Sequence, residues 1–230
     1  MIPCITSTNG LAAGLALVFD LDGVIVDSNR VHAVCWREYL RRCGLETPDD
    51  FELRMFGRRN DDIVRDIFGP DLDPAEVFRH GAEKERLYRQ MMRPVLQENL
   101  VPGVAAFLER HSVMPMAVAT NGEAANADFV IDTAGLRQYF RVVIDGHQVE
   151  RPKPDPEIYL RAAEMLSVAP GDCIVFEDSM AGIEAARASG ARVAAIRTTH
   201  SAAELPPVDV SIRDFLDPEL ERWLFVQRAA

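Results

Sequence analysis

Short, continuous apolar runs separated by helical segments are the feature that most limits the fold of this chain. The runs lie at residues 15–19, 116–119, 142–144, 173–176 and 193–196. A strand that is buried on both faces has no polar positions in alternation, so such runs are typical of a parallel sheet covered by helices. Helices are predicted between the later runs, at residues 123–133, 156–166 and 180–188. This order of segments predicts an α/β fold with a doubly wound parallel sheet.

The first two apolar runs are separated by nearly a hundred residues, far more than one crossover helix requires. The residues between them have apolar positions at helical spacing, interrupted by Gly and Pro. We therefore predict an all-helical subdomain at residues 31–99, inserted into an α/β core formed by residues 1–30 and 100–230. Residues 28–29 and 99–102 are the expected hinge linkers.

The composition excludes several classes of protein. Lys and Arg number 25 against 36 Asp and Glu, a formal net charge of −11, so no basic face is available for nucleic acid. No apolar run approaches the ~20 residues that span a membrane. The four Cys residues follow no metal or disulfide spacing, which favours a reducing compartment. No Lys or Arg precedes the apolar stretch 11–19, so we expect a cytoplasmic protein without a secretory signal.

Polar residues follow each of the first four apolar runs. They are Asp20 and Asp22 after the first run, Thr120 and Asn121 after the second, Asp145 after the third, and Glu177 and Asp178 after the fourth. The carboxyl ends of parallel strands meet at one edge of a sheet, which is where open α/β sheets bind ligands. We therefore expect these side chains to converge on one site.

The acidic residues of this set predict a metal site. Asp20 and Asp22 point to the same side if the strand continues extended, and Asp178 or Glu177 arrives from another strand. Carboxylates held this close cannot all ionise without a cation between them. Oxygen ligands of this kind suit Mg²⁺, which also shares its coordination with phosphate. The alternative is a pair of aspartates in an exposed turn before Gly23.

Lysine is rare in this chain and occurs at Lys84 and Lys153. Lys153 lies between two prolines, in a rigid loop that could place its ammonium on a phosphate or on a carboxylate. A solvated loop lysine is the alternative. The Thr120 hydroxyl and the amides of Asn121 and Gly122, at the start of the next helix, are expected to face the same anion.

Four separated motifs connect these residues. They are residues 19–28 (FDLDGVIVDS), 118–121 (VATN), 153–156 (KPDP) and 175–179 (VFEDS). In order and spacing they resemble the motifs of the haloacid dehalogenase-like hydrolase superfamily, in the branch of phosphatases and β-phosphoglucomutases with a helical cap. The resemblance implies a Rossmann-like core and a Mg²⁺-dependent phosphomonoester hydrolase that acts through an aspartyl-phosphate intermediate.

The resemblance also implies a role for each motif residue. Asp20 would be the nucleophile, and Asp22 would protonate the leaving oxygen and then deprotonate water. Mg²⁺ would be bound by Asp20, the backbone carbonyl of Asp22 and Asp178, with Glu177 helping directly or through water.

The phosphoryl oxygens would be held by Thr120, the Asn121 amide and Lys153, with Gly122 beside them. Two positions depart from the family pattern, because Pro152 precedes the lysine and Asn121 follows the threonine. Both departures concern loop geometry, and neither removes a charge that the reaction needs.

The helical cap is expected to close over the leaving group, between Asp22 and the turn at residues 57–60. Gly57 and Arg58 of this turn are candidate substrate contacts. His32 matches a histidine of the mutases that is also widespread in capped phosphatases. Its alternative interpretation is a helix residue packed under the cap.

The mutase alternative depends on a second phosphate site in the cap. The mutases use a Lys before the Gly and an Arg four residues after that Lys, whereas Phe56 and Asn60 stand at these positions here. Release to water is therefore favoured over reorientation of a bisphosphate. Arg58 and Arg59 could partly substitute, or they could form a solvated turn.

Other members of the superfamily and two non-enzymes fit the sequence less well. A phosphonatase needs a cap lysine, and Lys84 stands in a charged context that predicts an exposed helical face. A dehalogenase needs neither Asp22 nor the acidic pair at residues 177–178. A receiver-type phosphate-accepting module needs no helical insertion, and a degenerate binding module is expected to lack Asp20 or Asp22. We therefore expect a small phosphorylated metabolite, a sugar phosphate or a short organic phosphate, as the partner.

Overall fold

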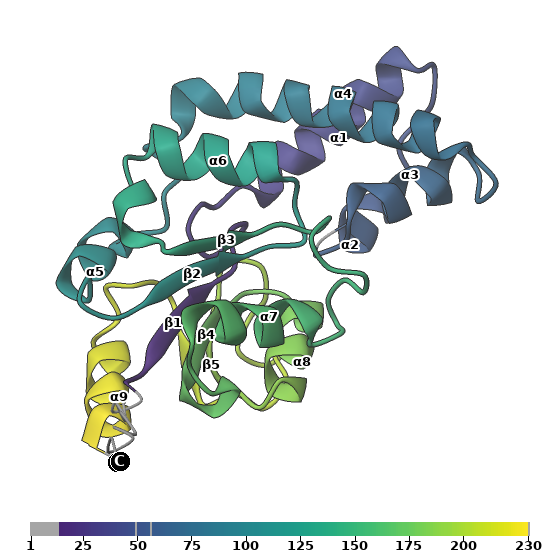
Figure 1. The fold of residues 1–230 in the computed structure, drawn as a ribbon. Helices are drawn as coiled ribbons and strands as arrows, with labels where there is room; N and C mark the ends of the chain where they lie inside the picture. The colour runs from purple at the N-terminus through teal and green to yellow at the C-terminus, as the bar shows by residue number, and fades with distance from the viewer. Residues whose placement is uncertain (1–13, 49, 56, 230) are drawn as a thin grey trace, which may run out of the picture.

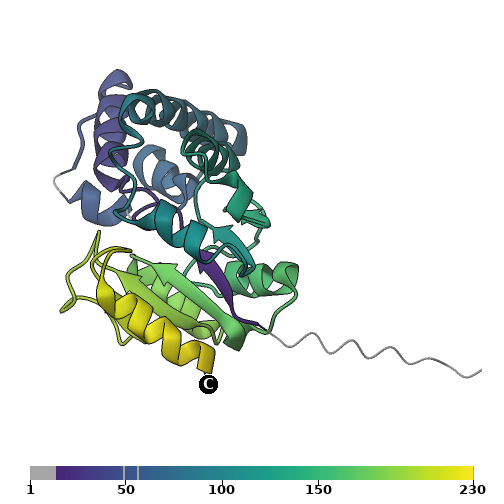
Figure 2. The same ribbon diagram turned by 90° about the vertical axis from the view of Figure 1, so that its left-hand side faces the viewer.

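Six parallel strands form one sheet at the centre of the protein (Figures 1 and 2). The computed structural model describes residues 14–229 except 49 and 56. The strands are β1 (Ala16–Phe19), β2 (Met116–Ala119), β3 (Val142–Ile144), β4 (Cys173–Glu177), β5 (Arg192–Ile196) and β6 (Val210–Ile212). Their order in the sheet is β3-β2-β1-β4-β5-β6, with every neighbouring pair parallel. The doubly wound α/β fold predicted from the apolar runs is confirmed.

Helices connect the strands. They are α1 (Asn29–Arg42), α2 (Phe51–Met55), α3 (Asn60–Phe68), α4 (Pro74–Met92), α5 (Val104–Arg110), α6 (Ala124–Thr133), α7 (Glu157–Leu166), α8 (Met180–Ala188) and α9 (Pro218–Ala229). Short 3-10 turns are η1 (Arg93–Val95), η2 (Arg137–Tyr139) and η3 (Pro170–Asp172). The predicted helices agree with α6, α7 and α8 to within one residue at their ends. The sequence prediction did not include β6, α5 or α9. β6 has the polar Ser211 at its centre, so it lacks the continuous apolar run by which the other strands are predicted.

The central strand β1 separates two apolar layers. Leu17 and Phe19 point into one cluster, which α5, α6 and α9 cover, and Ala16 and Val18 point into the other, which α7 and α8 cover. This alternation follows from the two-residue period of a strand. All four residues are fully buried, which explains why the run contains no polar residue.

Helices α1 to α4, called the cap below, enclose a third apolar cluster. It includes Trp36, Tyr39, Leu40, Phe51, Ile63, Val64 and Val77. Figures 1 and 2 show these helices together at one end of the molecule, away from α9. The two chain segments that join the cap to the sheet lie side by side, because Asp27 N–H donates to the Asn99 carbonyl at 2.8 Å and Val101 N–H to the Ile25 carbonyl at 3.0 Å.

The cysteines and the helices bear on the expected reducing compartment and on the expected absence of a membrane span. Cys35, Cys43 and Cys173 are free thiols, and Cys4 lies outside the described residues. Within the part of the chain that the structure describes, no helix has both the length and the apolar composition to cross a bilayer.

We predict that Phe176→Ala lowers the free energy of unfolding by about 3–5 kcal/mol, the range for truncating a buried Phe. Phe176 is fully buried and stacks on Phe19 with ring centroids 4.7 Å apart. Urea denaturation measures the change. The matched control is Phe225→Ala, because Phe225 is 75% exposed and its loss is expected to cost less than about 0.5 kcal/mol. Equal effects of the two substitutions would contradict this account of the core.

Candidate active site

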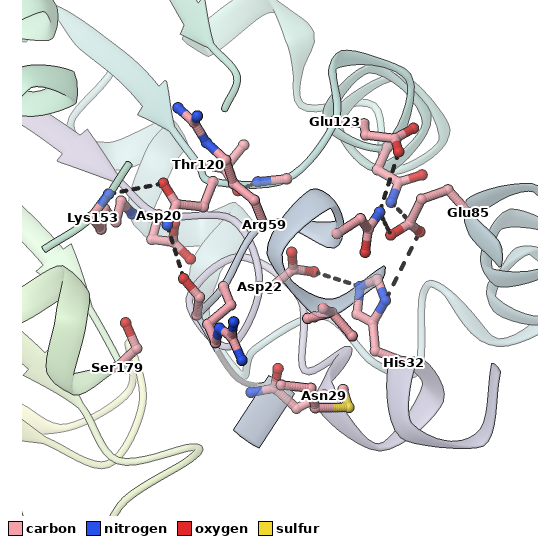
Figure 3. Close-up of a pocket in the computed structure, with 18 of the residues that line it drawn as sticks. Asp20, Asp22, Asn29, His32, Arg59, Glu85, Thr120, Glu123, Lys153 and Ser179 are labelled. Carbon is pink, nitrogen blue, oxygen red and sulfur yellow. Dashed lines mark hydrogen bonds and ion pairs between the residues drawn. The ribbon is translucent and has the colours of Figure 1, made fainter. Parts of the chain in front are cut away.

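A pocket opens between the cap and the edge of the sheet at which the strands end (Figure 3). It encloses about 840 Å³, including space open to solvent. The predicted site residues that line it are Asp20, Asp22, His32, Gly57, Arg58, Thr120, Asn121, Gly122, Lys153 and Asp178. Glu177 is fully buried beside the pocket. The fold therefore brings these residues to one volume. Asp145, which is also expected to converge here, does not line the pocket, because its carboxylate accepts from His147 N–H at 2.9 Å and Gln148 Nε2 at 2.6 Å within its own loop.

Asp20 lies at the end of the central strand. Its backbone N–H donates to the Phe176 carbonyl at 3.0 Å, which continues the pairing of β1 with β4. The residue is only 8% exposed, and its Oδ1 accepts a hydrogen bond from Lys153 Nζ at 2.6 Å. The alternative of an exposed turn is therefore wrong for Asp20.

Lys153 is buried and uses its ammonium fully. Nζ donates to Asp20 Oδ1 at 2.6 Å, to Glu177 Oε1 at 2.7 Å and to the Ala119 carbonyl at 3.0 Å. Burial by itself would lower the pKa of Lys153, but the charges of Asp20 and Glu177 outweigh it and raise the pKa above its ordinary value. The alternative of a solvated loop lysine is wrong. The ammonium is expected to contact either a phosphate or a carboxylate, and in the structure it contacts two carboxylates.

Glu177 receives hydrogen bonds on both carboxylate oxygens. Oε1 accepts from Lys153 and from the Tyr159 hydroxyl at 2.7 Å. Oε2 accepts from the backbone N–H of Asp178 at 2.9 Å and from the backbone and hydroxyl of Ser179 at 3.0 Å each. Burial opposes ionisation, but Lys153 and these donors lower the pKa of Glu177 below its ordinary value. The ionised Glu177 thereby positions Lys153.

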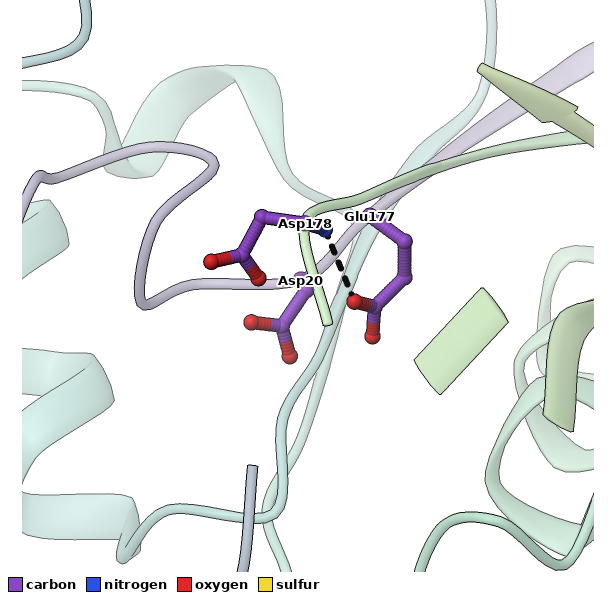
Figure 4. A group of neighbouring side chains, drawn as sticks. All are labelled: Asp20, Glu177 and Asp178. Atoms are coloured by element: carbon purple, nitrogen blue, oxygen red, sulfur yellow. Dashed lines mark hydrogen bonds between the residues drawn. The ribbon is translucent and has the colours of Figure 1, made fainter. Parts of the chain in front are cut away.

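Asp20, Glu177 and Asp178 form a compact acidic group (Figure 4). Each offers one carboxylate oxygen, and these oxygens lie within 4.8 Å of one another. Burial raises the pKa of Asp20 to about 8 despite Lys153, with the charges of Glu177 and Asp22 adding to the increase. Burial and the neighbouring carboxylates also raise the pKa of Asp178 well above its ordinary value. A divalent cation would relieve this repulsion, and a set of oxygen donors fits Mg²⁺.

Two oxygens of this group have no hydrogen-bond partner among the described residues. They are Oδ2 of Asp20 and Oδ1 of Asp178, since the hydrogen bonds of these two carboxylates use the opposite oxygens. Asp178 Oδ2 accepts from the hydroxyl of Thr199 and from Asn29 Nδ2 at 3.4 Å. Gly23 makes room for this carboxylate, because a Cβ at Gly23 would lie 1.9 Å from Asp178 Oδ2.

The Asp22 side chain faces the cap and not the acidic group. Its Oδ1 accepts from the Ser28 hydroxyl and lies 3.3 Å from His32 Nε2. Burial would raise the pKa of Asp22, but His32 and Ser28 lower it. The expectation that Asp20 and Asp22 point the same way is wrong, because the chain turns at Leu21, whose carbonyl accepts from Ile25 N–H at 2.9 Å.

The prediction that Lys84 lies on an exposed helical face is wrong. Lys84 is 2% exposed, and its Nζ contacts His32 Nδ1 at 2.7 Å and Glu85 Oε1 at 2.8 Å. This face of α4 is covered by α1 and by the core, so its charged residues pair with each other instead of with water. His32 is packed under the cap, because its ring stacks on Tyr88 with centroids 3.9 Å apart, and its Nε2 lies 3.3 Å from Asp22 Oδ1 at the pocket.

The loop that follows β2 is held by its own side chains. Thr120 Oγ1 accepts from the Gly122 N–H at 3.0 Å, so the expectation that this amide is free for an anion is wrong. Asn121 Nδ2 donates to the Gly57 carbonyl in the cap at 2.8 Å, and its Oδ1 accepts from Lys153 N–H at 3.2 Å. The Asn121 side chain therefore connects the cap turn to the lysine loop.

The two arginines of the cap turn have different partners. Arg58 Nη1 donates to Asp66 Oδ2 at 2.7 Å, within the cap. Arg59 Nη2 donates to the Val149 carbonyl at 2.9 Å, across to the core. Asn60 Nδ2 donates to Glu85 Oε1 at 2.7 Å. Phe56, the other cap position compared with the mutases, lies outside the described residues.

Several pocket residues carry no sequence signal of their own. Asn126 Nδ2 donates to Glu85 Oε2 at 2.6 Å, which joins α6 to the cap, and Glu123 Oε1 accepts from Asn60 at 3.2 Å. Burial would raise the pKa of Glu85, but Lys84, His32 and the hydrogen bond from Asn126 lower it to about 2. These residues lie within ordinary helical patterns, and only the packing of α4 against α6 brings them to the pocket.

Comparisons with known proteins agree with this geometry. A family model described as haloacid dehalogenase-like hydrolase matches residues 15–190. Fructose-1-phosphate phosphatase YqaB of Escherichia coli is 35% identical over 177 residues, which cover 76% of this chain and 92% of that protein. Beta-phosphoglucomutase of Bacillus subtilis is 29% identical over 184 residues, which cover 76% of this chain and 80% of that protein.

A solved structure extends the likeness to the whole fold. It is a HAD hydrolase, family IA, variant 3, from Entamoeba histolytica, with a TM-score of 0.80 at 26% identity, and the match covers 93% of this chain and 99% of that chain. The family model spans well over half of the chain and includes all four motifs. The chain is an enzyme with phosphatases among its relatives, and it belongs to the haloacid dehalogenase-like hydrolase family.

Proposed function

We propose that the protein is a Mg²⁺-dependent hydrolase of phosphomonoesters that acts through an aspartyl phosphate on Asp20. One observation carries the proposal: Asp20 ends the central strand with Oδ1 held by Lys153, within a buried acidic group that borders a pocket. In this proposal residues 100–230, with the segment before residue 31, are the catalytic core. Residues 31–99 are the cap that limits access of water.

The nucleophile would be Asp20 Oδ2, since Lys153 occupies Oδ1. As Oδ2 forms a bond to phosphorus, the bond from phosphorus to the leaving oxygen breaks, and Asp22 protonates that oxygen. Asp22 then takes a proton from water, the water oxygen attacks phosphorus, and phosphate leaves with Asp20 restored. The contacts of Asp22 with Ser28 and His32 hold the carboxylate at the cap side of the pocket, and by lowering its pKa they favour the ionised form that takes the proton from water.

The acidic group would hold the metal ion. Asp20, Asp178 and the backbone carbonyl of Asp22 are the proposed ligands, and Glu177 would contribute directly or through water. Bound Mg²⁺ would offset the negative charge shared by the nucleophile and the phosphoryl group. The Thr120 hydroxyl and the backbone N–H of Asn121 would bind phosphoryl oxygens beside Lys153.

A small phosphorylated metabolite fits a pocket that a cap covers, and we propose a sugar phosphate or a short organic phosphate in the cytoplasm. The relative from Escherichia coli that is named for fructose 1-phosphate supports this class. The mutase is the second candidate, because a relative bears that name. Asn60 disfavours it, since this amide pairs with Glu85 and Glu123 and supplies no positive charge for a second phosphate.

Asp20→Asn is predicted to lower phosphate release by at least about 10³-fold, because an amide oxygen is a poor nucleophile. Release from a panel of phosphorylated metabolites with Mg²⁺ measures the loss, and circular dichroism checks the fold. Asp132→Asn, at an exposed carboxylate paired with Arg137, serves as the matched control. Near-normal turnover of Asp20→Asn would refute the nucleophile assignment.

Chelation of divalent cations is predicted to abolish phosphate release, and added Mg²⁺ is predicted to restore it. Mg²⁺ should also raise the melting temperature of the wild type, because a cation that binds the folded acidic group stabilises it. Asp178→Asn should raise the Mg²⁺ concentration for half-maximal activity by about 10-fold or more, the range for lost metal contacts. Full activity after exhaustive chelation would contradict the proposal.

β-Glucose 1-phosphate supplied with a bisphosphate primer is predicted to yield free phosphate and no glucose 6-phosphate. The physical reason is the lack of a cationic group at Asn60 that would retain a bisphosphate intermediate. Chromatography of the products separates the outcomes. Conversion to glucose 6-phosphate faster than phosphate release would favour the mutase.

A further inference from the structure

Arg59 carries a positive charge that no described residue neutralises. Its Nη2 donates to a neutral acceptor, the Val149 carbonyl, and its Nε is buried without a hydrogen-bond partner. No ion pair joins Arg59 to any acidic group of the described residues. Arg58, by contrast, pairs with Asp66 of the cap. A guanidinium with an unused buried donor is costly unless a ligand completes it.

The cap turn places Arg59 beside the lysine loop. Asn121 binds the Gly57 carbonyl through Nδ2 and the Lys153 N–H through Oδ1. Val149, which accepts from Arg59, precedes Lys153 by four residues in the same loop. Both contacts of the turn therefore lie on segments next to the backbone of Lys153, whose ammonium holds Asp20. Figure 3 shows Arg59 among Asp20, Asp22 and Thr120.

The wall of the pocket formed by α4 and the start of α6 has the opposite charge. It carries Glu85 and Glu123, with the amides of Asn60 and Asn126 bonded to them. The cation of this wall, Lys84, is already paired with Glu85. An anion is therefore repelled by this wall. On the opposite side Lys153 is paired with Asp20 and Glu177, so among the described residues Arg59 is the cation of that side whose charge is left for the anionic part of a ligand.

We propose that Arg59 is a further substrate-binding residue, which brings a guanidinium from the cap onto the phosphoryl group of the substrate. This inference rests on the proposed function. The Arg59 guanidinium has donors beyond the one used by Val149, and a phosphoryl oxygen is a strong acceptor for them. Arg59 lines the pocket, and its contact with Val149 holds the cap turn against the core there. Phosphate binding and cap position are thereby coupled.

The test uses inorganic phosphate as the probe, with Mg²⁺ present. Its dissociation constant is measured by isothermal titration calorimetry, and its inhibition constant is measured in competition with ester hydrolysis. Arg59→Gln removes the charge but keeps an amide donor for Val149, and it should raise the dissociation constant of phosphate about 10-fold or more. Arg59→Lys keeps the charge and should recover part of the loss. Arg79→Gln changes an exposed cap arginine paired with Glu76 and should leave phosphate binding unchanged.

Three results would overturn the inference. Arg59→Gln could bind phosphate as the wild type does, or Arg58→Gln could lose affinity in its place. Arg59→Gln could also raise KM for the ester with no change in phosphate affinity, as expected of a latch between cap and core. A wild type that hydrolyses esters while one of these results holds leaves the proposed function intact. A wild type that neither binds phosphate nor releases it would overturn the proposed function and this inference together.

Discussion

The buried ammonium of Lys153 is the interaction on which the rest of the site depends. It bonds to Asp20 at the end of β1 and to Glu177 at the end of the neighbouring strand β4. Two carboxylates this close would otherwise repel each other or take up protons, because burial removes the water that stabilises their charge. One cation therefore orients the residue that we propose as nucleophile and opposes the rise in its pKa, which burial still holds at about 8. Tyr159, on α7, supports the arrangement by donating its hydroxyl hydrogen bond to Glu177.

The cap takes part in the site through polar contacts. Asn121 with Gly57 and Arg59 with Val149 join the cap turn to the core. Hydrogen bonds of this kind can exchange with water, whereas the main apolar cluster of the cap is internal to it. Cys35 of α1 and Leu87, Tyr88 and Met92 of α4 belong to the apolar cluster of the core, so α1 and α4 are anchored there and the turn depends on polar contacts. A ligand that contacts both the turn and the core would add to these contacts.

Local patterns predicted the parts of the structure in which burial follows directly from residue type. A strand covered on both faces must be apolar, so the runs at β1 to β5 were recognised. Inference of exposure from residue type is wrong for Lys84. Its charged neighbours in the helix indicate a solvent-exposed face, whereas the fold buries Lys84 and Glu85 together as an ion pair. The prediction from local pattern is also wrong for Asp22, because the extended conformation ends at Leu21 and the carboxylate turns toward the cap.

The sequence by itself determined the class of fold, the order of its elements and the motifs that mark the family, since hydrophobic periodicity and motif spacing are properties of one continuous chain. The tertiary structure decided which groups meet. Asp20 and Lys153 are 133 positions apart, and only the register of the parallel sheet brings them within a hydrogen bond. The adjacent Arg58 and Arg59 differ in charge pairing, because Arg58 donates to the Asp66 carboxylate and Arg59 donates to the neutral carbonyl of Val149. Charge compensation in a buried site depends on partners from other segments, and local pattern does not encode them.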